Sequence, residues 1–555
     1  MRLPIVPDPW LDPQRLENLS HEATRYFKKI IVPLSRSLDE LTGLSWNNRA
    51  WEILIGPWLR SFTFVVAEKR CFLEEQGLHK RLISVSESQF GTQGVESMSE
   101  WIDLTLTSEL HTYLFQEVAH AYGIVPRREE FRHAEKKVAS KTTIPKLEIL
   151  LSDVASRLGV LSSGSAFMFH KTYLSRKNEL FLSLKLGRLP LPTERFHTIS
   201  LIQKDVALRN RLLSSLRHSK ALSGKLGDQI YRLIAQCLPT NHLEGIEHLA
   251  NAVDKANWPK APKVIFDSNG YWADDVFKYY VASQTDKGAK LVIGQHGGML
   301  GSSKWSSQLD HQLAVSDKFL SWGWTMGLGE KVAPLGMLKP IERVRPRQGA
   351  PAVMPLLSLP QYAYDNSAFP IGAGGWESYF QDQLQFLNAL KELEADEVHL
   401  RSYPKDRGGF ALERLGEAGW VNSVIPSRPL KKDLRNYRLV IVTYNSTILL
   451  ETLAANHPTV AFWDFERWPL NDTATPYFEM LKEAGILFSS PLSAASHVEK
   501  IWSNINAWWL SPHVQNLRLE FVSQFAKQLS VGALAATLRM EKSSYSTEPT
   551  SAPPP

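Results

Sequence analysis

A polar turn between a hydrophobic run and a helical pattern carries the strongest chemical signal in the sequence. The run Leu439-Val-Ile-Val predicts a buried strand, and the apolar spacing from Thr447 to Ala455 predicts a helix. The first backbone N–H groups of a helix have no partner within it and lie at the positive end of the helix dipole. The turn is therefore expected to bind a phosphate.

Four side chains of this turn and helix are candidates for binding a nucleotide. Hydroxyl and amide groups at the helix start can join the backbone around a phosphate, and a carboxylate further along can accept a hydrogen bond from a ribose hydroxyl. The candidates are Asn445, Ser446, Thr447 and Glu451. The alternative is that Asn445 or Ser446 is an ordinary helix cap and that Glu451 only complements the dipole.

A second candidate for phosphate binding is a basic segment that follows the predicted strand Glu397-Val-His-Leu-Arg-Ser-Tyr. It contains Arg401, Lys405 and Arg407. Arg binds an oxyanion through its planar fork and Lys as a point charge, so the segment suits a diphosphate or a phosphodiester. Arg401 and Lys405 are the predicted contacts, with Arg401 starting nearest the sheet. The alternative is a loop whose charges meet only solvent.

A glycine-rich segment follows a third predicted strand, Lys290-Leu-Val-Ile-Gly. Its residues Gln295, His296, Gly297 and Gly298 are expected to form a loop on the acceptor side. Glycines let the backbone approach a ligand closely, and an imidazole can serve as acid, base or donor near neutral pH. His296 is therefore a catalytic candidate. The G-x-G-x-x-G spacing of dinucleotide-binding loops is absent.

Acidic residues after the strand Lys263-Val-Ile-Phe-Asp supply the remaining catalytic candidates. Asp267 ends the strand and could act as a general base or a nucleophile facing the same cleft as His296. Asp274 and Asp275 are expected to be acids at a helix start, where they complement the dipole. Asp310 is a reserve candidate.

Metal and cofactor motifs give a negative result. The sequence has no His-Glu-x-x-His and no Cys-x-x-Cys pair, so a metal-independent mechanism without a cofactor is predicted. It also lacks a Walker lysine loop and a Gly-x-Ser-x-Gly elbow, which argues against an ATPase and an α/β-hydrolase.

Short apolar strands that alternate with helical stretches position all of these residues. This alternation is typical of parallel sheets covered on both faces, whose ligands bind beyond the carboxyl ends of the strands. We predict an α/β fold with two Rossmann-like domains and a helical N-terminal elaboration. The predicted domains are residues 1–345, which would bind the acceptor, residues 346–540, which would bind a nucleotide, and a disordered polar tail over 541–555.

Bulk composition excludes several classes of protein. The chain has 555 residues, 43% of them hydrophobic, which is ordinary globular usage. The net charge is +6, and the Lys and Arg residues are interleaved with acidic residues instead of forming a run, so a nucleic-acid partner is not expected. Cys71 and Cys237 are too few for a disulfide framework, which favours the cytoplasm. No signal-peptide pattern and no run of about 18 apolar residues is present, so any membrane contact is expected to be peripheral, at the inner membrane.

Four segments together resemble a family of transferases from O-antigen and other surface-carbohydrate biosynthesis. They are Asn47-Asn-Arg-Ala-Trp-Glu-Ile-Leu-Ile-Gly-Pro-Trp-Leu, Gly294-Gln-His-Gly-Gly, Phe319-Leu-Ser-Trp-Gly-Trp and the turn from Thr443 to Glu451. The resemblance extends to about residue 528. It implies a nucleotide-sugar donor, a glycan or lipid-linked acceptor, and a part in making lipopolysaccharide or capsule.

The second half is more distantly similar to bacterial GT-B enzymes that use CMP-activated ketosugars, such as 3-deoxy-manno-octulosonate transferases and sialyltransferases. In those, a His-Pro pair and a helix start bearing Ser or Thr hold the CMP phosphate. Tyr403-Pro404 stands where His-Pro is expected. Because Tyr cannot supply a cationic imidazole, either Arg401 or Lys405 takes over this contact or the donor is not a CMP-sugar.

The predicted activity is therefore metal-independent sugar transfer by a GT-B glycosyltransferase. Asp267 or His296 would deprotonate the acceptor in an inverting reaction, and Asp267 as nucleophile would suit a retaining one. Two alternatives stay open. One is a CDP-polyol phosphotransferase of the teichoic-acid kind, and the other is a non-catalytic glycan-binding protein that uses the aromatic surface supplied by 17 Trp residues.

Overall fold

The fold is that of a computed structural model, which describes most of the chain. The described residues are 12–75, 84–85, 94–124, 127–128, 164–190, 202–344, 346–347, 349–356, 373–390, 393, 397–401, 411–420, 423–425 and 433–543. Contacts divide the chain into two compact units. Unit 1 comprises Met1–Glu17, Gln295–Leu309 and Phe319–Ser530, and unit 2 comprises Asn18–Gly294, Asp310–Lys318 and Val531–Pro555. These units do not show which segments fold on their own, so the boundary at 345/346 stays a prediction.

Unit 1 contains a 6-stranded parallel sheet in the order β10-β9-β8-β11-β12-β13. Counted along the chain, this is the 3-2-1-4-5-6 order of a Rossmann sheet, which reverses direction between β8 and β11. Ligands of such sheets bind at the carboxyl ends of the strands where the order reverses. The strands are β8 (Ala352–Pro355), β9 (Val398–Arg401), β10 (Val424–Ile425), β11 (Leu439–Val442), β12 (Thr459–Phe462) and β13 (Leu487–Phe488).

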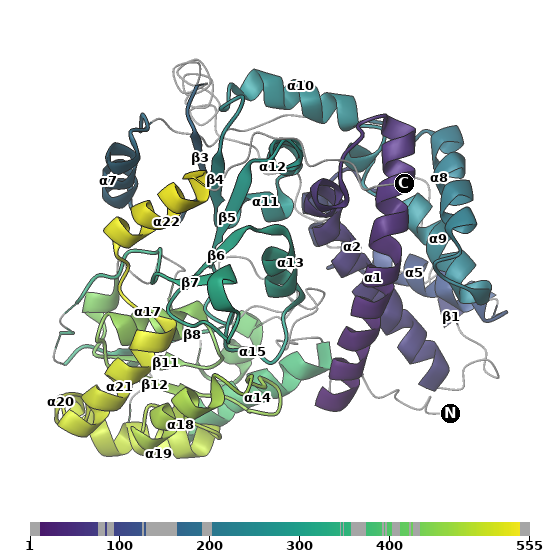
Figure 1. The fold of residues 1–555 in the computed structure, drawn as a ribbon. Helices are drawn as coiled ribbons and strands as arrows, with labels where there is room; N and C mark the ends of the chain where they lie inside the picture. Colours follow the sequence, from purple (N-terminus) through teal and green to yellow (C-terminus); the bar gives the residue numbers. More distant parts are fainter. Residues whose placement is uncertain are drawn as a thin grey trace. The chain divides into compact units, whose positions relative to one another are not determined.

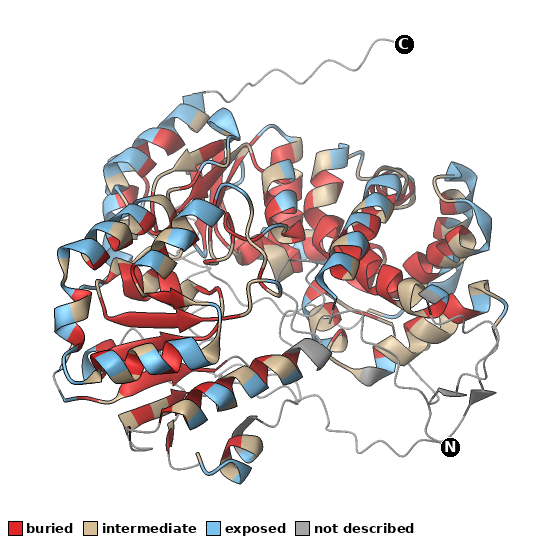
Figure 2. Ribbon diagram, turned by 90° about the horizontal axis from the view of Figure 1, so that it is seen from below, coloured by how far each residue is buried: buried red, intermediate tan, exposed pale blue. Residues whose placement is uncertain are grey.

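Helices cover this sheet because its strands are apolar on both faces. Every residue of β8, β11 and β12 is buried, as the red strands of Figure 2 show. Helix α14 packs against α19, while α17 and α18 pack against α21. The helices are α14 (Ala373–Ala389), α15 (Ala411–Glu417), α17 (Thr447–Ala454), α18 (Thr475–Glu483), α19 (Pro491–Trp502), α20 (Ile505–Trp509) and α21 (Pro512–Phe525), with the 3₁₀ turns η5 (Gly329–Lys331) and η8 (Leu434–Asn436).

A second sheet has 5 strands in the order β3-β4-β5-β6-β7. Strands β3, β4 and β5 pair in parallel within unit 2. Strands β6 and β7 also pair in parallel, and they belong to unit 1 except for Lys318. The order follows the chain without a reversal. The strands are β3 (Phe167–His170), β4 (Val264–Asp267), β5 (Lys290–Gly294), β6 (Lys318–Ser321) and β7 (Val332–Pro334), and a separate short pair is formed by β1 (Ser84–Val85) and β2 (Arg127–Arg128).

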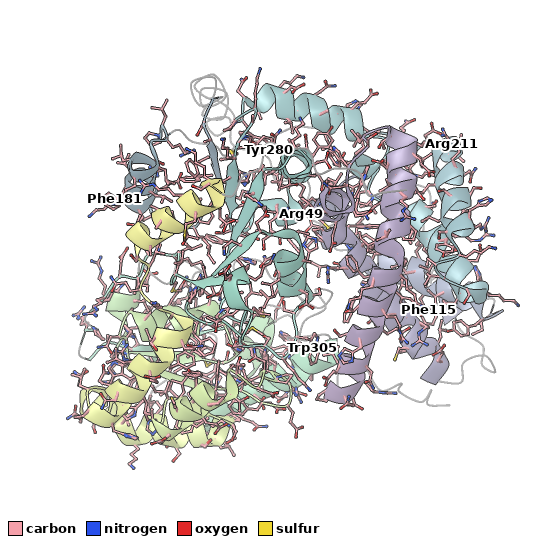
Figure 3. All side chains as sticks on the ribbon, viewed as in Figure 1. Arg49, Phe115, Phe181, Arg211, Tyr280 and Trp305 are labelled. Atoms are coloured by element: carbon pink, nitrogen blue, oxygen red, sulfur yellow. The ribbon has the colours of Figure 1, made fainter. Side chains whose placement is uncertain are left out.

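The helical elaboration belongs mainly to unit 2 and is joined to its sheet by packing between helices. Helix α12 packs against α2, α2 against α5, α5 against α9, and α9 against α8 (Figure 1). On α12 the side chain of Tyr280 is 1% exposed and donates a hydrogen bond to the Pro259 carbonyl, whereas Phe181 on α7 points outward (Figure 3). The helices are α1 (Pro13–Thr42), α2 (Asn48–Glu75), α4 (Met98–Leu104), α5 (Ser108–Ala121), α7 (Arg176–Leu186), α8 (Val206–Ser219), α9 (Gly224–Cys237), α10 (Ile246–Ala256), α11 (Gly270–Ala273), α12 (Asp275–Asp286), α13 (Ser307–Val315) and α22 (Val531–Ser543), with the 3₁₀ turn η4 (Thr240–His242).

These elements confirm the expected fold class, with two parallel α/β sheets and a helical N-terminal elaboration. Helix α22 extends to Ser543, and residues 544–555 of the predicted tail lie outside the described residues, so the tail stays a prediction. Within the described part of the chain, no helix is long and apolar enough to span a membrane.

A buried charge network in unit 2 shows that Asp275 is more than the helix-start acid that the sequence predicts. Its carboxylate accepts hydrogen bonds from the Asn241 amide at 3.2 Å and from the His242 imidazole at 3.0 Å, and the Lys278 ammonium lies 2.8 Å away. Burial alone would raise the pKa of Asp275, but Lys278 and His242 outweigh it and hold this pKa well below its ordinary value. Asp274 caps α12 by accepting from the Phe277 N–H at 3.0 Å, as predicted.

Asp275→Asn is expected to lower the free energy of unfolding by about 3–5 kcal/mol, because it leaves the fully buried Lys278 ammonium without its counter-charge. Asp274→Ala is the matched control and should cost only about 1 kcal/mol, the usual value of a helix cap. Urea denaturation, followed through the transition in which unit 2 unfolds, measures the loss of stability of both variants. Adding Lys278→Met to Asp275→Asn should recover stability, and equal losses for the two single variants would contradict the network.

Candidate functional site

The predicted phosphate turn lies where the Rossmann order of unit 1 reverses. Strand β11 ends at Val442, beside β8, and α17 starts five residues later at Thr447. A hydrogen bond between the Tyr379 and Thr443 hydroxyls, which are 2.7 Å apart, holds the start of the turn in place. The chain thus delivers the start of α17 to the carboxyl edge of the sheet, at the position where such sheets bind ligands.

Two buried polar side chains at the start of α17 have an atom without a hydrogen-bond partner. Ser446 has the extended backbone of an N-cap residue, yet its hydroxyl does not cap the helix. The Ser446 Oγ and the Asn445 Oδ1 both lack a partner, although the residues are only 6% and 2% exposed. A buried polar group without a partner costs about 1–3 kcal/mol, so this arrangement favours a ligand-binding role over the ordinary cap.

The glycine-rich loop after β5 lies directly against this helix start. The Gly298 N–H donates to the Thr447 Oγ1 at 3.0 Å. A Cβ on Gly298 would lie 2.7 Å from the Thr447 N and Cα atoms, which only a glycine avoids. The Asn445 amide adds a second link by donating to the Ser302 hydroxyl at 3.0 Å. The loop and the turn, which the sequence separates widely, therefore form one site.

The far end of the loop is fixed by the segment after β12. The Asn471 amide donates to the Gly301 carbonyl at 2.9 Å, and the Asn471 N–H donates to the Ser302 carbonyl at 3.0 Å. The Lys304 N–H donates to the Pro469 carbonyl at 2.9 Å. These contacts restrain the loop, as a pre-organised binding site requires.

His296 stands in this loop with a neutral imidazole. Its Nε2 lies 3.2 Å from the Gln308 amide nitrogen, a donor, so the ring accepts there and carries its proton on Nδ1. Burial and the nearby Lys339 ammonium lower the pKa of His296 to about 4, and the Gln308 bond opposes them. The residue keeps some exposed surface, so a proton can still reach the ring.

Glu451 lies one turn along α17 on the same face as Thr447. Its carboxylate forms an ion pair with the Lys339 ammonium at 3.4 Å, and both side chains stay about one-third exposed, at 32% and 29%. Lys339 thus connects the carboxylate predicted to bind a ribose with the imidazole predicted to act as a base. Both Glu451 and Lys339 can still reach a ligand.

Arg401 is the last residue of β9 and lies at the same carboxyl edge, two strands away from β11. At the usual strand spacing this is about 10 Å. The residue is 8% exposed, and burial lowers the pKa of its guanidinium, while Asp433 and Tyr437 oppose the shift. Its contact with an anionic group of a ligand stays a prediction. The other predicted cation, Lys405, and the Tyr403-Pro404 pair lie outside the described residues.

Gln295 has a structural role, in which both the oxygen and the nitrogen of its side-chain amide form hydrogen bonds within the protein. Its Oε1 accepts from the Trp322 N–H at 2.9 Å and the Trp324 indole at 2.8 Å, and its Nε2 donates to the Gly297 and Leu300 carbonyls. The side chain is completely buried. Gln295 therefore shapes the loop from within, and the predicted contact with an acceptor would have to come from Gly297 and Gly298.

Asp267 lies in unit 2, and all of its carboxylate is used for local structure. Oδ1 accepts from the His170 Nδ1 at 3.1 Å and the Gly270 N–H at 3.0 Å, and Oδ2 accepts from the Tyr271 N–H at 3.3 Å. Its exposure is 0%. The structure does not bring Asp267 to a surface where it could meet a substrate, so its role as base or nucleophile gains no support.

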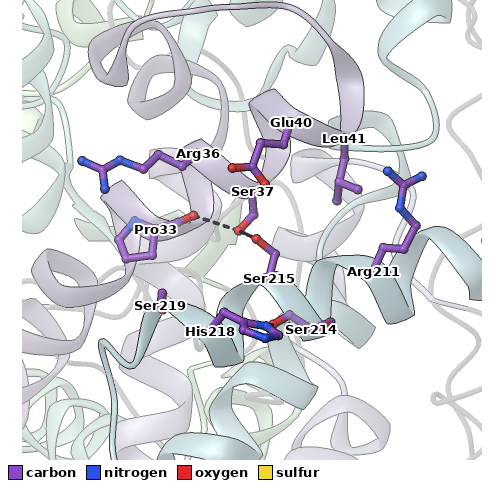
Figure 4. A pocket seen from close by; sticks show the side chains of 10 residues that line it. All are labelled: Pro33, Arg36, Ser37, Glu40, Leu41, Arg211, Ser214, Ser215, His218 and Ser219. Carbon is purple, nitrogen blue, oxygen red and sulfur yellow. Dashed lines mark hydrogen bonds between the residues drawn. The ribbon is translucent and has the colours of Figure 1, made fainter.

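Other possible sites are weaker. Among the described residues no group of three or more His, Cys, Asp or Glu side chains could hold a metal ion, and the metal-independent mechanism stays a prediction. A cavity of about 650 Å³ lies between α1 and α8, where the Ser37 and Ser215 hydroxyls are hydrogen-bonded at 2.8 Å (Figure 4). Arg36, Arg211 and His218 line it, but none of the predicted site residues does.

Several residues of the site carry no signal that sequence reasoning could use. Gln308 lies 12 residues from His296 along the chain and Lys339 lies further away, and neither stands in a recognisable motif. Asn471 belongs to a Leu-Asn-Asp-Thr segment that predicts a turn, but not the partner of that turn.

Gly298→Ala is expected to separate the loop from α17, because the added methyl group would clash with the Thr447 backbone. The melting temperature should fall, and the Ser302–Asn445 bond should be lost. Gly297→Ala is the matched control, since a Cβ there would meet only the Leu300 side chain at 3.9 Å. Thermal unfolding compares the two, and equal midpoints would contradict the close approach.

The His296 imidazole is expected to titrate near pH 4 instead of about 6.5. Histidine NMR of the wild type, with His296→Gln to assign the signal, measures this pKa. Lys339→Met should raise it, because the ammonium disfavours the imidazolium. The unfolded chain binds the proton more tightly, so the stabilising effect of the neutral ring is complete above about pH 6.5 and is lost as the pH falls to 4. A midpoint above 6 would contradict this environment.

Comparisons with known proteins place the chain in a family. No curated protein matches the chain. Solved structures that resemble it include an alpha,alpha-trehalose-phosphate synthase (UDP-forming) from Burkholderia vietnamiensis, with 13% identity and a TM-score of 0.31 over 57% of this chain and 80% of that one, a likeness too low to support an argument. A family model described as LIC12162 family transferase matches residues 2–534. Because this match spans nearly the whole sequence, the chain belongs to the LIC12162 family of transferases.

Proposed function

We propose that this transferase is a GT-B glycosyltransferase that moves a sugar from a nucleotide donor to a glycan or lipid-linked acceptor of bacterial surface polysaccharide. The donor would bind unit 1, at the start of α17. The resemblance of the four sequence segments to O-antigen transferases supports the choice of pathway. It also favours the cytoplasmic face of the inner membrane as the place of work.

One observation carries the proposal. The start of α17 lies at the reversal point of a Rossmann sheet and holds two buried polar atoms without partners, Asn445 Oδ1 and Ser446 Oγ. A hydroxyl donor and free helix N–H groups suit a phosphate, and an amide oxygen suits a sugar or ribose hydroxyl. A nucleotide supplies both kinds of group at once.

The binding groups would stabilise the leaving nucleotide. As the bond between the sugar carbon and the phosphate oxygen breaks, negative charge builds on the phosphate, and the Ser446 hydroxyl, the Thr447 hydroxyl and the helix dipole face it. Arg401, with Lys405, would neutralise the charge further along. Glu451 would accept a hydrogen bond from a ribose hydroxyl, while Lys339 holds the Glu451 carboxylate in place. CMP is the first nucleotide to test, because of the resemblance to ketosugar transferases.

His296 is the proposed general base. Its neutral ring can take the proton from the acceptor hydroxyl at Nε2, once this hydroxyl has displaced the Gln308 amide from that nitrogen. The acceptor oxygen then attacks the sugar carbon, which gives inversion. Asp267 is less suited to either catalytic role, since its carboxylate is enclosed and fully hydrogen-bonded. Removing a general base usually costs about 10²–10⁴-fold in rate, so the loss in His296→Gln should lie in that range.

Ser446→Ala is expected to abolish stabilisation by nucleotide without lowering the melting temperature of the free protein, which should rise by the relief of up to about 1–3 kcal/mol, because the substitution removes a buried hydroxyl that has no partner. A nucleotide at 100 times its Kd should stabilise the wild type by about 2.7 kcal/mol. Thermal shift against CMP, CDP, UDP, GDP and ADP measures the effect and shows which base is preferred.

Ser490→Ala is the matched control, since Ser490 caps α19 by accepting from the Ser493 N–H at 3.2 Å. It should lower the melting temperature, because a lost helix cap costs about 1 kcal/mol of stability, and it should keep the full nucleotide response. If no nucleotide at millimolar concentration stabilises the wild type, the proposed donor site is wrong. A response that survives in Ser446→Ala would place the nucleotide elsewhere.

A further inference from the structure

A small polar pocket in unit 2 has no part in the site described so far. Its volume is about 230 Å³, and it opens where β3 and β4 end, the edge at which parallel sheets bind ligands. Pockets for drug-sized ligands measure about 300–1,000 Å³, so this one admits a single small molecule. The lining residues are Lys171, Thr172, Tyr173, Leu174, Glu179 and Asn269.

The backbone of this pocket is strained at two positions. Lys171 and Tyr173 have φ of 38° and 61°, in the left-handed region that residues other than glycine rarely adopt. Such strain persists only where the surroundings enforce it, and it concentrates at binding sites. Here the Ser268 hydroxyl donates to the Thr172 carbonyl at 3.2 Å and the Asn269 amide donates to the Tyr173 hydroxyl at 3.1 Å.

The buried His170–Asp267 pair joins the two chain segments that line the pocket. His170 precedes the strained segment, and Asp267 precedes the segment that bears Asn269. Their side chains join at 3.1 Å, and Asp267 also accepts the Gly270 N–H, so the two segments are fixed to each other. A Cβ on Gly270 would lie 2.0 Å from the His170 Nδ1, which explains the glycine. Asp267 therefore has a structural role, because it links the two segments that form this pocket.

The lining groups match hydroxyl groups better than they match an anion. Lys171 and Glu179 cancel in charge, and the Thr172 hydroxyl donates to the Glu179 Oε2 at 3.0 Å. Glu179 and Asn269 offer acceptors, Lys171 and Tyr173 offer donors, and a sugar hydroxyl both donates and accepts. Burial raises the pKa of Tyr173, so its hydroxyl keeps its proton. The Tyr173 ring adds an apolar surface of the kind that sugar rings contact.

We propose that this pocket binds one neutral pyranose ring of the acceptor glycan. The proposal rests on the proposed glycosyl transfer and specifies its acceptor as neutral, since one cation and one anion leave the lining without net charge. It gives unit 2 a sugar-binding site built on residues 171–174, 179 and 269, in place of the catalytic role first assigned to Asp267.

Saturation-transfer NMR of the full chain with a panel of neutral methyl pyranosides tests this site. At least one should bind the wild type. Asn269→Ala and Glu179→Gln should each weaken it about fivefold to tenfold, the effect of one lost hydrogen bond of about 1 kcal/mol. Asn210→Ala, on the exposed face of α8, is the matched control and should bind as the wild type does. Melting curves confirm that each variant folds.

Three results would overturn the inference. The first is that no pyranoside binds while CMP or another nucleotide still stabilises the chain, which leaves the proposed donor site intact. The second is that inorganic phosphate displaces the sugar, since the pocket would then be an anion site. The third is that the sugar binds Asn269→Ala and Glu179→Gln as well as it binds the wild type. Failure of the donor site appears separately, as pyranoside binding without any nucleotide response.

Discussion

The close approach of Gly298 to the start of α17 is the constraint on which the candidate site depends. It joins residues 149 positions apart and leaves no room for a side chain between the loop and the helix. Around this contact, Asn445 reaches Ser302 and Asn471 holds the loop from the far side. Without it, the imidazole of His296 and the polar start of α17 would belong to separate parts of unit 1.

The Rossmann order of the unit 1 sheet explains why this contact lies where it does. The reversal between β8 and β11 leaves space at the carboxyl edge, because the connections on either side run away from each other. Unpartnered polar atoms that are costly elsewhere collect there, at Asn445 and Ser446. The enclosed Asp267 of the other sheet shows the opposite case, in which every oxygen is used and the residue serves the fold.

The sequence was sufficient to predict those features of the fold and site whose signal is local. The strand at Leu439–Val442, the helix from Thr447 and the cap at Asp274 each follow from hydrophobic period or cap chemistry within a few residues. It was insufficient where partners come from afar. Asp275 looks like any helix-start acid until Asn241 and His242 are brought to it, and Gln295 looks like a loop residue until Trp322 and Trp324 enclose it. Long-range pairing of this kind leaves no periodic trace.

The charges of the site also explain why a base as weak as His296 could serve the proposed reaction. With no ligand present, Lys339 and burial keep the imidazole neutral and lower its pKa. A nucleotide phosphate at α17 would add negative charge beside the Lys339–Glu451 pair, and negative charge favours the imidazolium. Under the proposed function, donor binding thus raises the proton affinity of His296. The base would gain strength when the nucleotide is bound.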